Sequence, residues 1–293
     1  MSDLPIDMSN PAVRDFLTLT RLQVLTPLSL LINIAAVSVC SFAISPSLAE
    51  VARMYPTSLT PRPSLIGTYI AAVYIMQVGY CVVLVLARKT ETKQALIKGT
   101  GMSLVLANWV MGFWAVAWCF KAFKVSSILI GILIILLLYS NIVLSVYHPI
   151  ALARPLDTAF IHAPIRLFLN LPLTLLFPVS IFIAIGHSWE QGKTKDYNNY
   201  AWEGFGVFFA LNALYAVYIA VQRDIVWTVS SSWLALSVWR QMPKSAPVSI
   251  TAMVFTFAHP VILVISYVAM IFHKRRRGGA IALPPDQENG NGQ

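Results

Sequence analysis

Long apolar stretches, separated by short polar connections, run through almost the whole chain. A helix rises about 1.5 Å per residue, so about 20 apolar residues cross the roughly 30 Å hydrocarbon core of a bilayer. Lipid offers no hydrogen-bond partner to backbone groups, so segments of this kind must be helical. The pattern therefore predicts an all-α fold, a polytopic transmembrane helical bundle. The long stretches are Thr26–Ile44, Leu65–Ala87, Gly101–Phe120, Ser126–Tyr147, Arg166–Gly186, Ala201–Val221 and Val248–Phe272.

One further apolar segment, Ile225–Trp239, is shorter than the others. Its length fits a re-entrant or surface helix as well as a short span. If it crosses the membrane, Lys and Arg are concentrated on the N-terminal side, as expected for the cytosol; if it does not, the two sides carry similar numbers. We therefore favour eight spans with both termini cytosolic, and keep seven spans plus a re-entrant or surface helix as the alternative.

The composition agrees with a membrane bundle, since 57% of the residues are hydrophobic and only 11% are charged, against about 25% charged in soluble domains. The predicted organisation is a cytosolic N-terminal segment (1–25), the transmembrane bundle (26–272), and a cytosolic tail (273–293) that is first basic and then disordered. The expected membrane is an endomembrane (endoplasmic reticulum, Golgi or vacuole) or the plasma membrane.

The net charge of +9 is concentrated beside the spans. Such clusters are typical of cytosolic anchoring and of contact with anionic lipid. The expected partners are therefore membrane lipids, with anionic lipid at Lys274, Arg275, Arg276 and Arg277, and not nucleic acid. The oligomeric state is left open by the sequence.

Several amides and one histidine fall near the middle of the predicted spans. Polar groups at this depth turn away from lipid and either bond to one another or line a cavity. Both readings stay open; the second would be a site for a neutral or zwitterionic molecule. Because none of these groups is a carboxylate, a proton- or cation-driven pump is disfavoured. The candidate ligand-binding residues are Asn33, Gln77, Asn108, Asn212 and His259, with Ser232 at similar depth.

The connection from His148 to Arg166 is rich in reactive side chains. An Asp and a His can form a base and its orienting partner, and arginines can hold a phosphate or carboxylate. The alternative is that these charges pair with one another at the membrane surface. The candidate catalytic residues are Arg154, Asp157, His162 and Arg166. The sequence contains no nucleotide-binding, zinc-protease or serine-hydrolase motif, so it indicates no metal and no cofactor.

Small residues and prolines add two expectations about packing. Stripes at helical spacing, one from Gly101 through Gly112 to Cys119 and one from Gly206 to Ala220, predict close helix–helix contact. Pro172 and Pro260 each lie inside a span, where proline removes a backbone donor and leaves the carbonyl four residues earlier without its partner.

Several strings together resemble a family of multi-pass membrane proteins of ascomycete fungi that is classed as a domain of unknown function. They are TPLSLLIN, QVGYCVVLVLARKTETK, LANWVMGFWAVAW, YSNIVLSVYHP, RPLDTAFIHAPIRLF, WEGFGVFF, QRDIVWTVSSSW and PKSAPV, and they extend from about Thr26 to Phe272. The resemblance implies a fungal endomembrane protein and supplies no activity or site residue.

Three functional hypotheses follow. The first is a carrier-like or binding protein for a neutral or lipid-like small molecule. The second is an intramembrane enzyme that acts on a lipid or isoprenoid, and the third is a non-catalytic accessory protein of trafficking or of a fungal biosynthetic pathway. We favour the first and thus a protein that is not an enzyme, because no catalytic motif is present.

Overall fold

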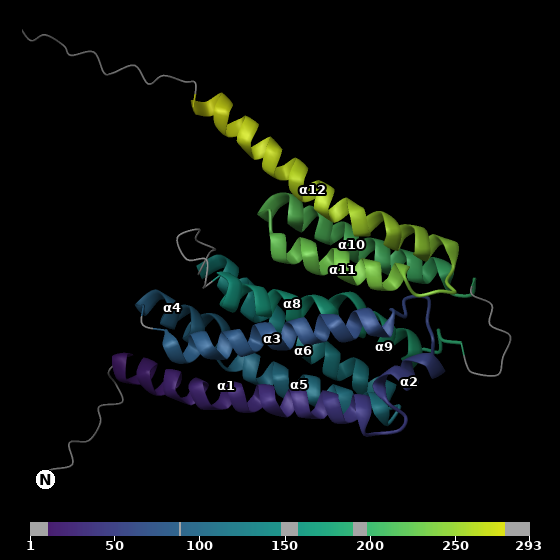
Figure 1. The fold of residues 1–293 in the computed structure, drawn as a ribbon, viewed down its shortest axis with the longest axis horizontal. Coiled ribbons are helices and arrows are strands. Elements are labelled where there is room, and N and C mark those ends of the chain that lie inside the picture. Colours follow the sequence, from purple (N-terminus) through teal and green to yellow (C-terminus); the bar gives the residue numbers. More distant parts are fainter. Residues whose placement is uncertain (1–10, 88, 148–157, 190–197, 279–293) are drawn as a thin grey trace, which may run out of the picture.

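The computed structural model describes residues 11–87, 89–147, 158–189 and 198–278, with side chains described from 13 to 273 within these ranges. All of the regular elements in these residues are helical (Figure 1). They are α1 (Pro11–Phe42), α2 (Leu48–Met54), α3 (Pro63–Leu86), α4 (Thr90–Gln94), η1 (Ala95–Thr100), α5 (Gly101–Cys119), α6 (Phe123–Tyr147), η2 (Thr158–His162), α8 (Ala163–Leu171), η3 (Pro172–Leu176), α9 (Phe177–Ala184), α10 (Ala201–Gln222), α11 (Ile225–Trp239) and α12 (Ala246–Gly278); η1, η2 and η3 are π-helical.

Within the described residues, seven helical stretches are long and apolar enough to cross a membrane. The predicted polytopic helical bundle is therefore confirmed. The stretches are Val13–Phe42, Pro63–Leu86, Thr90–Cys119, Phe123–Tyr147, Thr158–Ala184, Ala201–Gln222 and Ala246–His273.

The short helix α11 has 15 residues and lies alongside α10 and α12 rather than across the end of the bundle (Figure 1). It begins beside the end of α10 and ends beside the start of α12, so the chain changes direction at both of its ends. As a result α1 begins and α12 ends at the same end of the molecule. A chain that crosses a membrane eight times has both termini on the same side, so this arrangement agrees with eight crossings.

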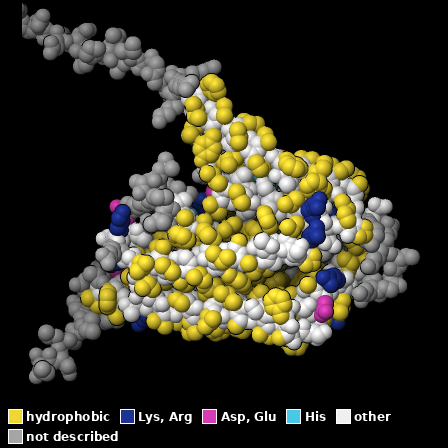
Figure 2. Space-filling view, viewed as in Figure 1, with side chains coloured by type: hydrophobic (Ala, Val, Ile, Leu, Met, Phe, Trp, Pro, Cys, Tyr) yellow, Lys and Arg dark blue, Asp and Glu magenta, His cyan; other side chains and the backbone are white. Residues whose placement is uncertain are grey.

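The helices form two groups that meet along α8 and α11. Figure 1 shows α1, α3, α5, α6, α8 and α9 on one side and α10, α11 and α12 on the other. Hydrogen bonds join the groups at one end: the Trp233 indole Nε1–H donates to the Leu65 carbonyl at 3.0 Å, and the Arg62 N–H donates to the Ser237 carbonyl at 2.8 Å. Hydrophobic side chains, yellow in Figure 2, cover much of the face that it shows, and the exposed hydrophobic residues include many valines, leucines and isoleucines.

The span that contains Pro172 starts earlier than its apolar pattern indicated, at Thr158 instead of Arg166. It is divided into η2, α8, η3 and α9, and the π-helical segment η3 begins at Pro172. The predicted interruption is thus present, since proline cannot donate to the helical ladder. The longer span also brings Arg166 into the bundle instead of leaving it at the boundary.

Of the two small-residue stripes that predicted close helix packing, the one on α5 is in a helix contact and the one on α10 is not at Gly206. On α5, Asn108, Gly112 and Cys119 are buried, and a Cβ at Gly112 would lie 3.4 Å from the Ala36 Cβ, so α1 and α5 approach closely there. On α10, Gly206 is exposed and nothing lies within 4 Å of where its Cβ would be. The predicted packing seam at Gly206 is wrong.

Candidate functional site

Two of the predicted ligand-binding residues bond directly to each other. The Asn33 Nδ2 on α1 donates to the Asn108 Oδ1 on α5 at 2.9 Å, and the Tyr74 hydroxyl on α3 donates to the Asn33 Oδ1 at 3.2 Å. Asn33 and Asn108 are fully buried. These contacts join three helices in a region where lipid cannot compete for hydrogen bonds.

A second pair of the predicted residues lies between α10 and α12. The His259 Nε2 is 3.2 Å from the Asn212 carbonyl oxygen, and the Asn212 side-chain amide donates to the Phe208 carbonyl at 2.8 Å. Both residues are fully buried. Neither is hydrogen-bonded to the cluster around Asn33, so the predicted midplane set consists of separate groups.

Gln77 differs from these residues. Only 1% of Gln77 is exposed, and neither its Oε1 nor its Nε2 has a hydrogen-bond partner among the described residues. An unpaired buried amide costs about 1–3 kcal/mol for each group that loses water. Among the predicted ligand-binding residues, Gln77 is therefore the one whose polar atoms are both unused.

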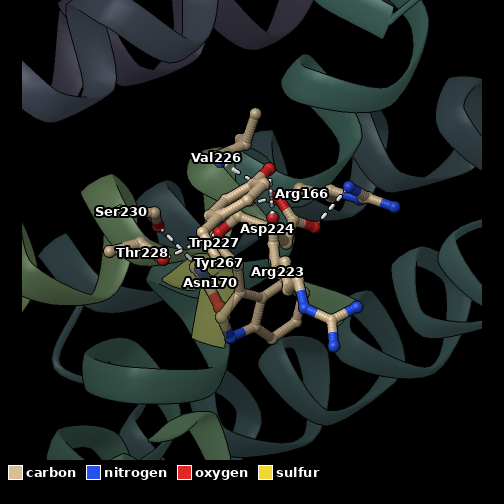
Figure 3. Close-up of polar contacts among 9 residues, drawn as sticks. All are labelled: Arg166, Asn170, Arg223, Asp224, Val226, Trp227, Thr228, Ser230 and Tyr267. Carbon is tan, nitrogen blue, oxygen red and sulfur yellow. Dashed lines mark hydrogen bonds and ion pairs between the residues drawn. The ribbon is translucent and has the colours of Figure 1, made fainter. Parts of the chain in front are cut away.

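An ion pair joins Arg166 on α8 to Asp224, the residue before α11 (Figure 3). Both side chains are buried, with 5% and 3% exposed. The Asp224 Oδ1 also accepts from the Val226 and Trp227 N–H groups at 2.9 and 3.1 Å, so Asp224 caps the N-terminus of α11. Such a cap satisfies backbone donors that a helix leaves free.

Further hydrogen bonds continue along the same face of α8 and η3. Asn170 donates to the Ser230 hydroxyl at 2.7 Å, and the Tyr69 hydroxyl lies 2.6 Å from the same oxygen. Thr174 bonds to the Tyr215 hydroxyl at 3.0 Å. These contacts, the α8 polar row, join α8 and η3 to α3, α10 and α11.

The candidate catalytic residues are only partly within the described structure. Arg154 and Asp157 lie outside the described residues. His162 ends η2 and is buried. Arg166 forms an ion pair with Asp224, a partner that was not predicted from the sequence.

Asp224, Asn170 and Ser230 were not predicted as interaction partners. The α8 and η3 residues of this row could have been found from their spacing. Arg166, Asn170 and Thr174 are four residues apart and so share one face of a helix. The residues opposite them come from two distant segments, and a single sequence does not reveal such pairing.

A groove of about 380 Å³ lies between α11 and α12. Its lining includes Val229, Ser232 and Trp233 from α11 and Thr256, Pro260 and Val264 from α12. Val229 and Val264 are 58% and 60% exposed, so the groove opens on the outer face. Its surface is almost entirely apolar.

Two of the lining residues, Ser232 and Thr256, carry polar groups without their usual hydrogen-bond partners. The Ser232 hydroxyl is buried and has no hydrogen-bond partner in the described residues. Pro260 has no N–H, so the Thr256 carbonyl lacks its usual helical donor. The Thr228 and Thr256 hydroxyls, in contrast, are bonded to the carbonyls of Asp224 and Ala252. The residues of the groove thus include one unpaired hydroxyl, on Ser232, and one residue, Thr256, whose carbonyl Pro260 leaves without its helical donor.

A family model described as TSPO-like protein matches residues 22–270 of the chain. No curated protein and no solved structure matches the chain.

Proposed function

The chain belongs to the TSPO-like protein family, and from this premise we propose that it is a non-catalytic membrane protein that binds a small, mostly apolar, neutral molecule. The observation that carries the proposal is the groove between α11 and α12, with the unpartnered Ser232 hydroxyl in an apolar lining. Volumes of about 300–1,000 Å³ with few polar groups are usual for small-molecule sites.

The polar atoms of the groove define the ligand chemistry. The Thr256 carbonyl accepts only, whereas the Ser232 hydroxyl can donate or accept. A hydroxyl on the ligand can satisfy both, and the rest of the molecule can be hydrocarbon. A membrane-dissolved lipid or isoprenoid alcohol fits this description, and it reaches the groove from the bilayer because the groove opens on the outer face.

The Arg166–Asp224 ion pair supports a binding protein over the intramembrane enzyme, because the guanidinium is already engaged by a carboxylate. Gln77 is the residue of the predicted midplane set best suited to a second contact, since both of its polar atoms lack partners. A fungal endomembrane location with cytosolic termini remains part of the same proposal.

Photolabelling tests the groove. The purified protein in lipid nanodiscs is irradiated with a diazirine-bearing long-chain alcohol and digested, and labelled peptides are located by mass spectrometry. Labelling is expected on α11 and α12, and excess unlabelled alcohol should suppress it.

A matched pair of variants makes this test specific. Val264→Trp fills the groove and should abolish the labelling. Val217→Trp, at a valine of α10 that is 63% exposed and outside the groove lining, should leave it unchanged. Equal labelling of both variants would show that the groove is not the binding site.

A further inference from the structure

A second cavity, of about 450 Å³, lies at the end of the bundle where α3 and α12 begin. We name it the loop pocket. It is lined by Arg53 from α2, by Arg62 before α3 and by Lys244 before α12, together with Thr57, Thr60 and Gln241. Its position at the ends of the spans places it at the membrane surface, and Figure 2 shows Lys and Arg side chains in dark blue at this end of the molecule.

Lys244 is held in place by backbone oxygens. Its Nζ donates to the Ser58 carbonyl at 2.7 Å and to the Thr60 carbonyl at 3.1 Å. An ammonium has three N–H donors, so the charged form keeps a third for another acceptor. The lining includes two arginines besides Lys244 and no carboxylate. This is a positively charged, partly enclosed cavity with unused donors.

We propose that the loop pocket binds the phosphate group of an anionic molecule at the membrane surface. Guanidinium groups bind phosphate through charge-assisted hydrogen bonds, often two at a time. The Gln241 amide adds a neutral donor beside the three cations. The Thr57 hydroxyl also lies in the lining, where it is hydrogen-bonded to the Thr60 hydroxyl at 3.2 Å. The pocket is larger than one phosphate group, which leaves room for the rest of a headgroup or for a small phosphorylated compound.

Binding depends on pH through Lys244. Burial lowers the pKa of Lys244 to about 7. The neutral amine still has two N–H groups for the two carbonyls, but only the protonated form offers a third to an anion. The other charged groups of the lining are Arg53 and Arg62. His187 stacks on Tyr200 outside the lining, with ring centroids 4.2 Å apart. The phosphate ligand also gains negative charge between pH 6 and pH 8, so the contribution of Lys244 has to be separated from that of the ligand. The ratio of wild-type to Lys244→Gln affinity should be larger at pH 6 than at pH 8.

The ligand source is distinguished by two probes. Phosphatidic acid in phosphatidylcholine nanodiscs represents a lipid headgroup, and glycerol 3-phosphate in solution represents a free compound. Lipid retention is read by native mass spectrometry and glycerol 3-phosphate binding by calorimetry. Binding of phosphatidic acid alone assigns the pocket to lipid, and binding of both assigns it to phosphate compounds generally. If neither probe binds, the proposal fails.

The variants distinguish ligand binding in the loop pocket from ligand binding at the basic residues that end α12. These residues lie at the opposite end of α12 from the loop pocket. Arg53→Gln with Arg62→Gln, at exposed positions that leave the Lys244 hydrogen bonds in place, should weaken binding at least about tenfold. Arg240→Gln, an exposed arginine nearby that does not line the pocket, should change it little. Equal binding in the two variants would overturn the proposal. So would a ratio of wild-type to Lys244→Gln affinity that does not change between pH 6 and pH 8.

Discussion

Arg166 and Asp224 are 58 positions apart in the sequence and form a buried ion pair between α8 and the turn that starts α11. The pair lies at one end of the contact between the two helix groups. Asp224 has a second role as the N-cap of α11. One carboxylate therefore both neutralises a buried cation and fixes the sharp reversal from α10 into α11.

Removing either charge should destabilise the protein strongly. Arg166→Met, or Asp224→Asn, which keeps the capping oxygen, leaves one buried charge without its partner and should lower the free energy of unfolding by about 3–5 kcal/mol. The double variant should lose much less than the sum. Unfolding in mixed detergent micelles measures all three, and additive losses would contradict a direct interaction.

Gln77 and Asn33 should respond in opposite ways to apolar replacement. Gln77→Met removes two buried polar atoms that have no partner, so stability should rise by about 1 kcal/mol. Asn33→Leu breaks the bonds to Asn108 and Tyr74 and should lower it by about 1 kcal/mol. Thermal melting in detergent compares them. A loss of stability in Gln77→Met would reveal a partner for this amide.

Two glycines of α3 provide a matched test of packing against η2. A Cβ at Gly79 would overlap the ring of Phe160, whereas nothing lies within 4 Å of one at Gly67. Gly79→Ala should therefore cost about 1–3 kcal/mol, and Gly67→Ala should be neutral or stabilise by about 0.5–1 kcal/mol, because alanine favours the helix. Equal melting temperatures would show that η2 is not packed against Gly79.

Lys244 should give stability a pH dependence. Its pKa falls from 10.5 to about 7 on burial, so between these values the unfolded chain holds a proton that the folded chain has lost. Stability should then rise with pH through this window and be lowest below pH 7. The difference in melting temperature between the wild type and Lys244→Gln should follow this trend. A constant difference from pH 6 to pH 9 would contradict it.

The direction of α11 predicts where the chain ends lie. Because α11 runs alongside α10 and α12, tags fused to the two termini should be digested by protease from the same side of sealed membrane vesicles. Tags on opposite sides would mean that α11 does not cross, which is the seven-span alternative.

The apolar pattern predicted the helices well because each span needs about 20 apolar residues whatever its neighbours are. It could not predict which side of a helix meets a neighbour. On α10 the buried face carries Phe208, Asn212 and Tyr215 rather than the alanine stripe. In a membrane protein the side of a helix that packs on its neighbours and the side that faces lipid are both apolar, so the hydrophobic pattern does not distinguish them.

The candidate site was predicted only in part. Depth along a span follows from counting residues, so Asn33 and Asn108 were identified as interior groups. The partners of Arg166 and the two cavities depend on how loops and distant helices meet. Lys244 is an ordinary lysine in the sequence, and only the carbonyls of Ser58 and Thr60 make its environment unusual.

The ion pair between Arg166 and Asp224 also has a consequence for biosynthesis. Ribosomes make the chain from its N-terminus, so the helix with Arg166 is completed before its counter-ion has been translated. Inserting an unpaired arginine into the bilayer centre costs about 2.5–3.5 kcal/mol, and less near its edge. We therefore expect this helix to settle into its final depth only after α10 has been made and Asp224 has followed it.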